Sequence, residues 1–151
     1  VCEMLLMLAD KYDSFVLMYD DIFITRRVEF PYYGKGLISS NSSVSGYNAC
    51  KSNTKDALLY FGKPTINFEC HNPFIFESKK LKDLYENINI SINHLPKSLY
   101  ANYYNIEPLT INDLKSNEMF KIKDNIAKHG VFSTCDNLTF GIQKIIKDLQ
   151  N

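Results

Sequence analysis

The order of apolar and polar positions along the chain predicts strands alternating with helices. Residues 2–9 are apolar on most faces, which is typical of a packed helix, and residues 15–18 form a continuous apolar run. Such a run is typical of a strand covered on both faces of an α/β sheet. Further strand-like or extended segments are predicted at 22–25, 65–70, 107–111 and 131–133. Further helices are predicted at 53–61, 78–87, 95–104 and 139–149. This alternation indicates the α/β class.

The longest irregular stretch covers residues 31–48, which include Pro31, three glycines and a run of Ser and Asn. Loops of this length usually act as lids or lack order. We therefore expect a lid here, ahead of a helix that Gly62 and Pro64 bring to an end. The helix at 78–87 is amphipathic, and its buried face is predicted to carry Leu81, Leu84 and Tyr85.

Composition and charge exclude several classes of protein. The 151 residues carry 17 Lys and Arg against 17 Asp and Glu. This balance argues against a nucleic-acid partner, because such surfaces need an excess of Lys and Arg. No apolar run approaches the roughly 20 residues of a membrane-spanning helix.

The length fits a single domain over residues 1–151. Because the chain enters an apolar helix directly at Val1, we expect a fragment of a larger domain whose first elements are absent.

The four cysteines, Cys2, Cys50, Cys70 and Cys135, show no close pairing. Zinc sites use paired ligand spacings, and disulfide scaffolds are smaller and denser in cysteine. Free thiols in a reducing compartment are therefore predicted, which favours a cytoplasmic location.

Asp20 and Asp21 directly follow the apolar run at 15–18. In α/β sheets, ligands bind outside the carboxyl ends of strands. Two adjacent carboxylates repel each other, and Mg²⁺ or Mn²⁺ relieves the repulsion while binding ligand phosphates. A solvated turn without function explains the same dipeptide equally well.

Two classes of enzyme use such an acidic pair. The hairpin of reverse transcriptases is superficially similar to residues 17–23, but it needs another metal-binding Asp upstream and a basic surface, and only nineteen residues precede Asp20. The second class is nucleotide-sugar transferases of the GT-A type.

Seven short segments follow one another at 15–24, 53–54, 62–64, 69–76, 98–104, 112–115 and 132–137. Taken together, they resemble segments of the Stealth-type sugar-phosphate transferases and of related bacterial and phage glycosyltransferases of capsular polysaccharide synthesis. Two positions depart from that pattern. Tyr19 stands where the group carries Asn, and Lys97 stands where it carries Arg. A Lys would make a point-charge contact with phosphate where Arg makes a bidentate one.

The resemblance implies a GT-A-like, Rossmann-type mixed sheet flanked by helices, without its first nucleotide-binding strand and helix. It implies an enzyme that transfers a sugar-1-phosphate from a nucleotide-sugar donor to a glycan or other hydroxyl acceptor, with Mg²⁺ or Mn²⁺ as cofactor. Two alternatives remain open, a conventional hexosyltransferase that releases a nucleoside diphosphate and a non-catalytic carbohydrate-binding or assembly module. The implied location is cytoplasmic, including the inner face of the membrane.

The resemblance also suggests roles for particular residues. Asp20 and Asp21 would bind the metal, and His71, held at a bend by Asn72-Pro73, would be the catalytic base. The remaining candidates are Asp113 and Asp136 as further catalytic residues, and Lys97, Tyr100 and Asn102 as binding residues. Several of these residues have a structural alternative. His71 would bond a backbone carbonyl, Asp113 would cap a turn and Asp136 a helix, and Tyr100 would pack in the core. His94 and His129 are predicted to lie at the surface.

Overall fold

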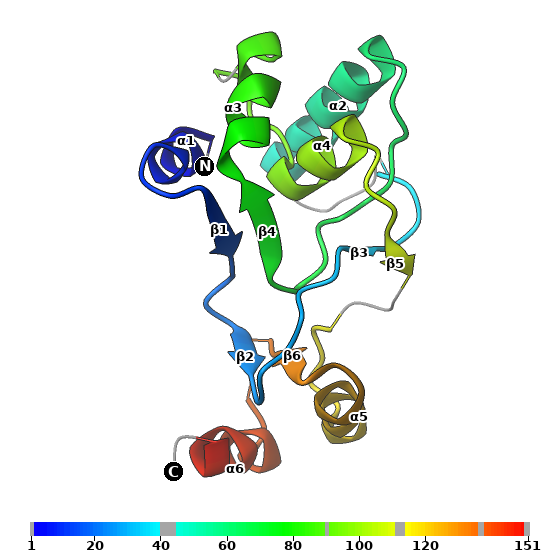
Figure 1. The fold of residues 1–151 in the computed structure, drawn as a ribbon. Helices are drawn as coiled ribbons and strands as arrows, with labels where there is room; N and C mark the ends of the chain where they lie inside the picture. Colours follow the sequence, from blue (N-terminus) through cyan, green and yellow to red (C-terminus); the bar gives the residue numbers. More distant parts are fainter. Residues whose placement is uncertain (1, 40–44, 90, 111–113, 136–137, 150–151) are drawn as a thin grey trace. The chain divides into compact units, whose positions relative to one another are not determined.

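The structure is a computed structural model and shows a mixed α/β protein (Figure 1). It describes residues 2–39, 45–89, 91–110, 114–135 and 138–149. The chain forms two compact units that each draw on separate stretches of sequence. Unit 1 comprises Val1–Leu17, Pro31–Glu69 and Phe74–Ile111, and unit 2 comprises Met18–Phe30, Cys70–Pro73 and Asn112–Asn151.

The described residues of unit 1 form two short sheets and four helices. Strand β1 (Ser14–Leu17) pairs antiparallel with β4 (Phe74–Glu77), and β3 (Tyr33–Gly34) pairs in parallel with β5 (Leu109–Thr110). The helices are α1 (Cys2–Ala9), α2 (Ser45–Tyr60), α3 (Ser78–Asn87) and α4 (Pro96–Tyr103). Helix α1 packs against α3, and α2 packs against α4 (Figure 1).

The core of unit 1 is rich in aromatic side chains. Phe74 and Phe76 of β4 and Tyr100 of α4 are almost fully buried. The ring of Tyr100 lies 6.0 Å from that of Phe74 and 5.0 Å from that of Phe76, edge to face in both cases. Such pairs stabilise a core beyond the burial of their area. Leu81, Leu84 and Tyr85 of α3 pack into the same core, as the amphipathic pattern predicted.

Unit 2 is built on one antiparallel pair of strands, β2 (Ile22–Ile24) and β6 (Val131–Ser133), with helices α5 (Met119–His129) and α6 (Phe140–Leu149). Phe23 stacks on Phe132 at 5.0 Å between ring centroids. Phe132 packs with Ile122 of α5 and Ile142 of α6 in a small core. Three fully buried side chains thus join both helices to the sheet.

Several predicted elements differ from those observed. The run at 15–18 was expected to be buried on both faces, but Val16 of β1 is 40% exposed, because the strand has a single partner and one solvent-facing side. The helix predicted at 53–61 begins earlier, at Ser45. Strand β4 and helix α5 were not predicted at all. Helix α5 nevertheless carries sequence signals, since Met119, Ile122 and Ile126 recur on one face and a glycine follows the last residue.

The segment at 65–70 was predicted as a strand but is not one. Its backbone pairs with residues 35–38 through an isolated antiparallel bridge between Leu37 and Ile66, with bonds such as Ile38 N to Thr65 O at 2.8 Å. Side chains of α4 satisfy other backbone groups, because the Asn102 amide bonds both the N–H and the carbonyl of Ile66. Side chains therefore occupy positions where a neighbouring strand would pair.

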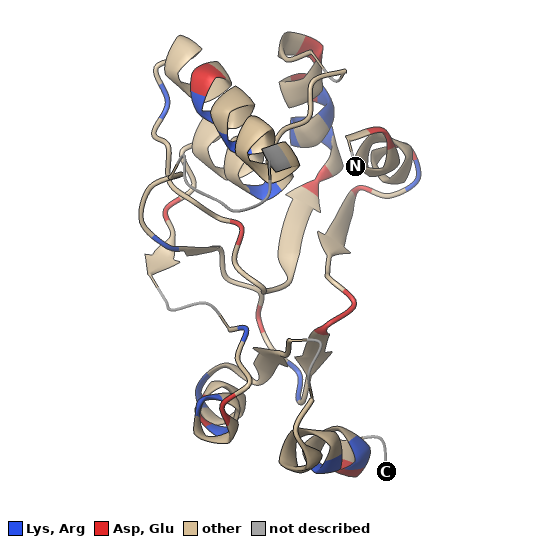
Figure 2. Cartoon of the chain, turned by 180° about the vertical axis from the view of Figure 1, so that it is seen from behind, with Lys and Arg blue, Asp and Glu red and all other residues tan. Residues whose placement is uncertain are grey.

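Helices α2, α3, α5 and α6 each carry charges of both signs (Figure 2). Among the described residues, no helix combines the length and the apolar character that crossing a bilayer requires.

Candidate functional site

Asp20 and Asp21 form the turn that leads into β2. The turn is closed by a hydrogen bond from Ile22 N to Tyr19 O at 3.3 Å. Asp20 is exposed, whereas the side chain of Asp21 retains 19% of its accessible surface. The two neighbouring carboxylates therefore differ in environment, and Asp21 is the one that faces protein groups.

Lys115 pairs with Asp21, with Nζ lying 2.7 Å from Oδ2. Strand β6 explains how these distant residues meet. On one side of β6, Ser133 is in register with Ile22, and on the other side it forms a parallel bridge with Lys115. The backbone around the site is also well bonded, with Thr134 N donating to Asp21 O at 3.2 Å. Both chain segments that carry the ion pair are thus fixed to the same strand.

The environment keeps Asp21 ionised. Burial raises its pKa, but hydrogen bonding from Lys115 and Ser133 and the charges of Lys115 and His71 outweigh burial and hold the pKa below the usual 3.8. Among the described residues, Asp21 Oδ1 is buried without a hydrogen-bond partner, and so is Ser133 Oγ. Ser133 therefore lies close enough to stabilise the carboxylate without forming a bond of normal geometry. Buried polar atoms without partners are uncommon and often mark ligand sites.

His71 belongs to the same unit and lies in the turn Cys70–Pro73, where Asn72 N donates to Cys70 O at 2.9 Å. Its ring is half-buried and lies 5.5 Å from the ring of Tyr19, at an interplanar angle of 49°. Tyr19 directly precedes the acidic pair in the sequence, and its ring contacts that of His71. The structure brings together three of the predicted site residues, His71, Asp20 and Asp21.

A pocket of about 230 Å³ adjoins the acidic pair. Its polar lining comes from Asp20, Asp21, Thr134 and Cys135. In the described part of the chain, no group of three His, Cys, Asp or Glu side chains could hold a metal by itself. Mg²⁺ bound to a nucleotide needs only one or two protein carboxylates, because phosphates and water complete its shell. The carboxylates of Asp20 and Asp21, with the unpartnered Oδ1, meet that smaller requirement.

Lys97, Tyr100 and Asn102, the predicted binding residues, lie in α4 of unit 1, and all three are buried. The hydroxyl of Tyr100 accepts a hydrogen bond from Glu77 N at 3.1 Å. Asn102 accepts from Ile66 N at 2.9 Å and donates to Ile66 O at 2.7 Å. These polar atoms stabilise unit 1, and a role in ligand binding stays a prediction. Asp113 and Asp136 lie outside the described residues.

Sequence reasoning missed two features of unit 2. Lys115 gives no local signal as the partner of Asp21, because the pair depends on the pairing of β6 with two distant segments. The second is Arg26, whose Nη2 donates to the carbonyls of Ala127 and Lys128 at 3.0 and 3.3 Å. This cation thereby caps the carboxyl end of α5.

The prediction for one histidine of unit 1 was wrong. His94 was expected at the surface, but only 7% of it is exposed. Its polar sequence neighbours gave a misleading signal, since the segment that carries it folds back onto α2.

By fold, the chain is a mixed α/β protein with two-stranded sheets. Comparisons with protein-family models, curated proteins and solved structures gave no match for this chain.

Proposed function

We propose that this chain is part of a metal-dependent transferase with a GT-A-like domain, which moves a sugar-1-phosphate from a nucleotide-sugar to a hydroxyl acceptor in surface polysaccharide synthesis. The proposal depends mainly on Asp21, a carboxylate that Lys115 and Ser133 keep ionised. One of its oxygens is buried without a partner among the described residues, beside a pocket that it shares with Asp20. The resemblance of the surrounding segments to Stealth-type enzymes provides the reaction class.

In this proposal, residues of unit 2 bind the cation and orient its ligands. Asp21 offers Oδ1 to the cation, and Lys115 fixes the orientation of the carboxylate by holding Oδ2. A bound Mg²⁺ or Mn²⁺ would neutralise charge on the donor diphosphate. Ser133 Oγ has an unused donor that can reach a ligand oxygen or the carboxylate.

His71 orients the acceptor hydroxyl and takes its proton. The hydroxyl oxygen attacks the phosphorus that carries the sugar, and the bond from that phosphorus to the bridging oxygen breaks. The nucleoside monophosphate then leaves. In a hexosyltransferase the attack would occur at the anomeric carbon and a nucleoside diphosphate would leave, so the nucleotide product distinguishes the two reactions.

The test has two readouts, Mn²⁺ binding followed by electron paramagnetic resonance and the nucleotide released from a panel of nucleotide-sugars. Asp21→Asn is expected to abolish Mn²⁺ binding in the presence of a nucleoside diphosphate, and to lower turnover by about 100-fold or more. The matched control is Asp10→Asn, because Asp10 also pairs with a lysine, Lys82, at 2.8 Å but lies in unit 1.

Lys115→Met is expected to strengthen Mn²⁺ binding to the free chain, since it releases Oδ2 of Asp21. Unchanged Mn²⁺ binding by Asp21→Asn, or an equal loss in Asp10→Asn, would contradict the proposed metal site. Release of a nucleoside diphosphate would show that the enzyme transfers the sugar and not the sugar-phosphate.

A further inference from the structure

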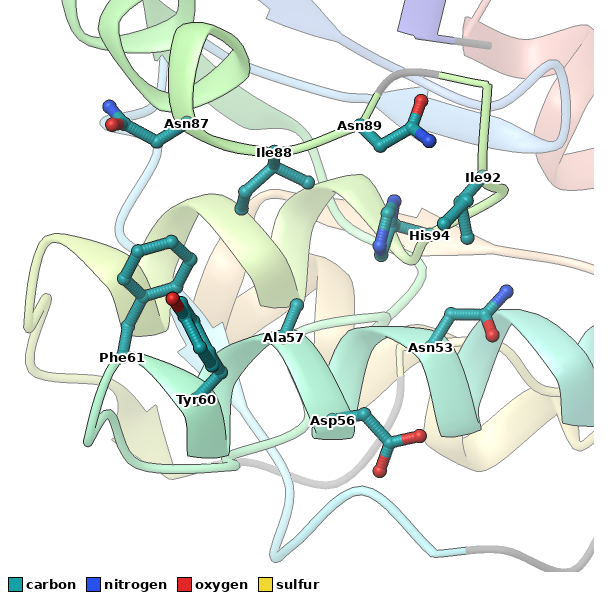
Figure 3. A pocket seen from close by; sticks show the side chains of 10 residues that line it. All are labelled: Asn53, Asp56, Ala57, Tyr60, Phe61, Asn87, Ile88, Asn89, Ile92 and His94. Atoms are coloured by element: carbon teal, nitrogen blue, oxygen red, sulfur yellow. The ribbon is translucent and has the colours of Figure 1, made fainter.

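A second pocket lies wholly within unit 1, between α2 and the segment that follows α3 (Figure 3). Its volume of about 380 Å³ is within the range of small-molecule sites. Ile88 and His94 point from the segment after α3 toward α2, whereas Tyr60 and Phe61 lie at the other end of the pocket (Figure 3). None of these residues takes part in the proposed transfer reaction.

The walls of this pocket are fixed by hydrogen bonds. Asn53 Nδ2 of α2 donates to Asn93 O at 3.0 Å. Thr54 Oγ1, on the next residue, accepts from Leu95 N at 2.8 Å and donates to Cys50 O at 2.7 Å. Two consecutive side chains of α2 therefore hold the segment that carries His94, so the pocket exists before any ligand binds.

His94 lines the pocket and carries a buried ring nitrogen that has no partner of normal geometry among the described residues. The residue is 7% exposed, and among the described residues its Nδ1 makes no hydrogen bond of normal geometry. Burial lowers the pKa of the imidazole more than the Ile92 backbone raises it, so the ring is neutral near pH 7. A neutral imidazole pairs well with a group that can both donate and accept, such as a hydroxyl.

The other lining residues favour an uncharged ligand. Among the described residues that line the pocket there is no Lys or Arg, and the one carboxylate, Asp56, points away from His94 (Figure 3). The polar lining consists otherwise of carboxamides, which offer a donor and an acceptor each. Asn89 already accepts a bond from Ser91 N at 2.9 Å through Oδ1, and within the described ranges its Nδ2 makes no bond and can donate to a ligand.

The far end of the pocket provides an aromatic face. Tyr60 is 85% exposed, and its ring lies edge to face against Phe61, with 5.1 Å between the centroids. An exposed aromatic ring offers an apolar face on which the C–H groups of a sugar can pack.

We propose that this pocket binds a neutral pyranose, with the ring of Tyr60 beneath the sugar, and with His94 and the Asn89 carboxamide bonding its hydroxyls. The apolar floor from Ala57 and Ile88 faces the C–H groups of the sugar. The site is independent of Asp21, so it does not depend on the proposed transferase activity. An anion such as phosphate would lack any cationic partner in the lining.

The test measures binding of methyl α-glucopyranoside, methyl α-galactopyranoside and methyl α-mannopyranoside to the full chain by saturation-transfer NMR, with inorganic phosphate as a competitor. At least one pyranoside is expected to bind in the millimolar range, and phosphate is expected not to displace it. Tyr60→Ala should weaken binding by about tenfold, and His94→Leu should abolish it. Tyr12→Ala is the matched control, because Tyr12 is an exposed tyrosine of unit 1 outside this pocket.

Asp21→Asn is expected to bind the pyranoside as the unmodified chain does, which separates this site from the transferase proposal. Tyr60 is so exposed that its replacement leaves the core intact, and Tyr60→Ala therefore remains informative even if His94→Leu unfolds. Absence of pyranoside binding, displacement by phosphate, or full binding by Tyr60→Ala would each overturn the proposal.

Discussion

Lys115 Nζ lies 2.7 Å from Asp21 Oδ2, although the two residues are 94 positions apart. Their side chains are partly shielded, at 29% and 19% exposure, so water screens the pair less than it screens ion pairs on the helix surfaces. The pair keeps the Asp21 pKa low although burial alone would raise it. One lysine thus stabilises the charge of the carboxylate and occupies only one of its oxygens.

The Asp21–Lys115 pair should be measurable as a coupling energy. Asp21→Asn and Lys115→Met are each expected to lower the free energy of unfolding by about 1–2 kcal/mol, and the double variant should lose less than the sum. Urea denaturation of the four proteins at neutral pH gives this double-mutant cycle. The coupling should shrink as the pH falls, because the stability that a lowered Asp pKa provides is present above 3.8 and is lost as pH falls through the folded-state pKa. Strict additivity would show that the pair contributes nothing to folding.

Ser133→Ala should separate folding from function at the same site. Ser133 is fully buried and its Oγ has no partner of normal geometry, so its removal should change the unfolding free energy by less than about 1 kcal/mol. Loss of the hydroxyl should also raise the pKa of Asp21. The pKa can be followed by NMR of the carboxyl carbon, with denaturation run in parallel. A large loss of stability would mean that the hydroxyl is bonded in the folded chain.

Asn102→Ala is expected to destabilise the chain by about 2–3 kcal/mol, because it leaves two partly buried backbone groups of Ile66 without this partner. Thermal and urea denaturation measure this loss. Asn87→Ala is the matched control, since that exposed amide makes a single bond, to Asp83 O at 2.8 Å, and little change is expected. An Asn102→Ala variant of normal stability with impaired donor binding would instead favour the binding role predicted from the sequence.

Two glycines with similar backbone angles should respond differently to replacement by alanine. Gly130 ends α5 with φ +67°, and an added Cβ would lie 2.6 Å from Val28 Cγ1 and 2.7 Å from Arg26 Cγ. Gly62 has φ +63° with open space around it. Gly62→Ala should cost about 1 kcal/mol from backbone strain alone, and Gly130→Ala about 2–4 kcal/mol from strain and overlap. Equal losses in denaturation experiments would show that Arg26 and Val28 move aside freely.

His94 should make the stability of the chain depend on pH in mildly acidic solution. Its folded-state pKa is below the ordinary 6.5, so the unfolded chain takes up the proton first as the pH falls below that value. The unfolding free energy should therefore decline from about pH 6.5 down to the folded-state pKa. Denaturation at about pH 7.5 and about pH 5 should show a smaller decline for His94→Gln than for the unmodified chain. His129→Gln is the control, and an unchanged decline in His94→Gln would contradict the predicted role of His94.

Local patterns in the sequence were sufficient for much of the secondary structure. The amphipathic spacing of Leu81, Leu84 and Tyr85 predicted both the limits and the buried face of α3, because helix periodicity depends on neighbours a few positions apart. The apolar runs before and after Asp20 and Asp21 likewise predicted β1, β2 and the acidic turn between them. The sequence also identified His71 as a candidate in the same part of the molecule.

Tertiary structure alone decided which side chains meet. Lys115 reaches Asp21 because β6 pairs with two segments that are far apart in the chain, and no local pattern encodes that pairing. Burial of His94 likewise depends on Asn53 and Thr54, which hold its segment on α2. Asn102, predicted to contact ligand, bonds the backbone of Ile66, because long-range folding brings that segment beside α4. The sequence by itself thus determined several elements, such as α3 and β2, and the acidic turn, whereas the partners of each polar side chain depended on contacts between distant segments.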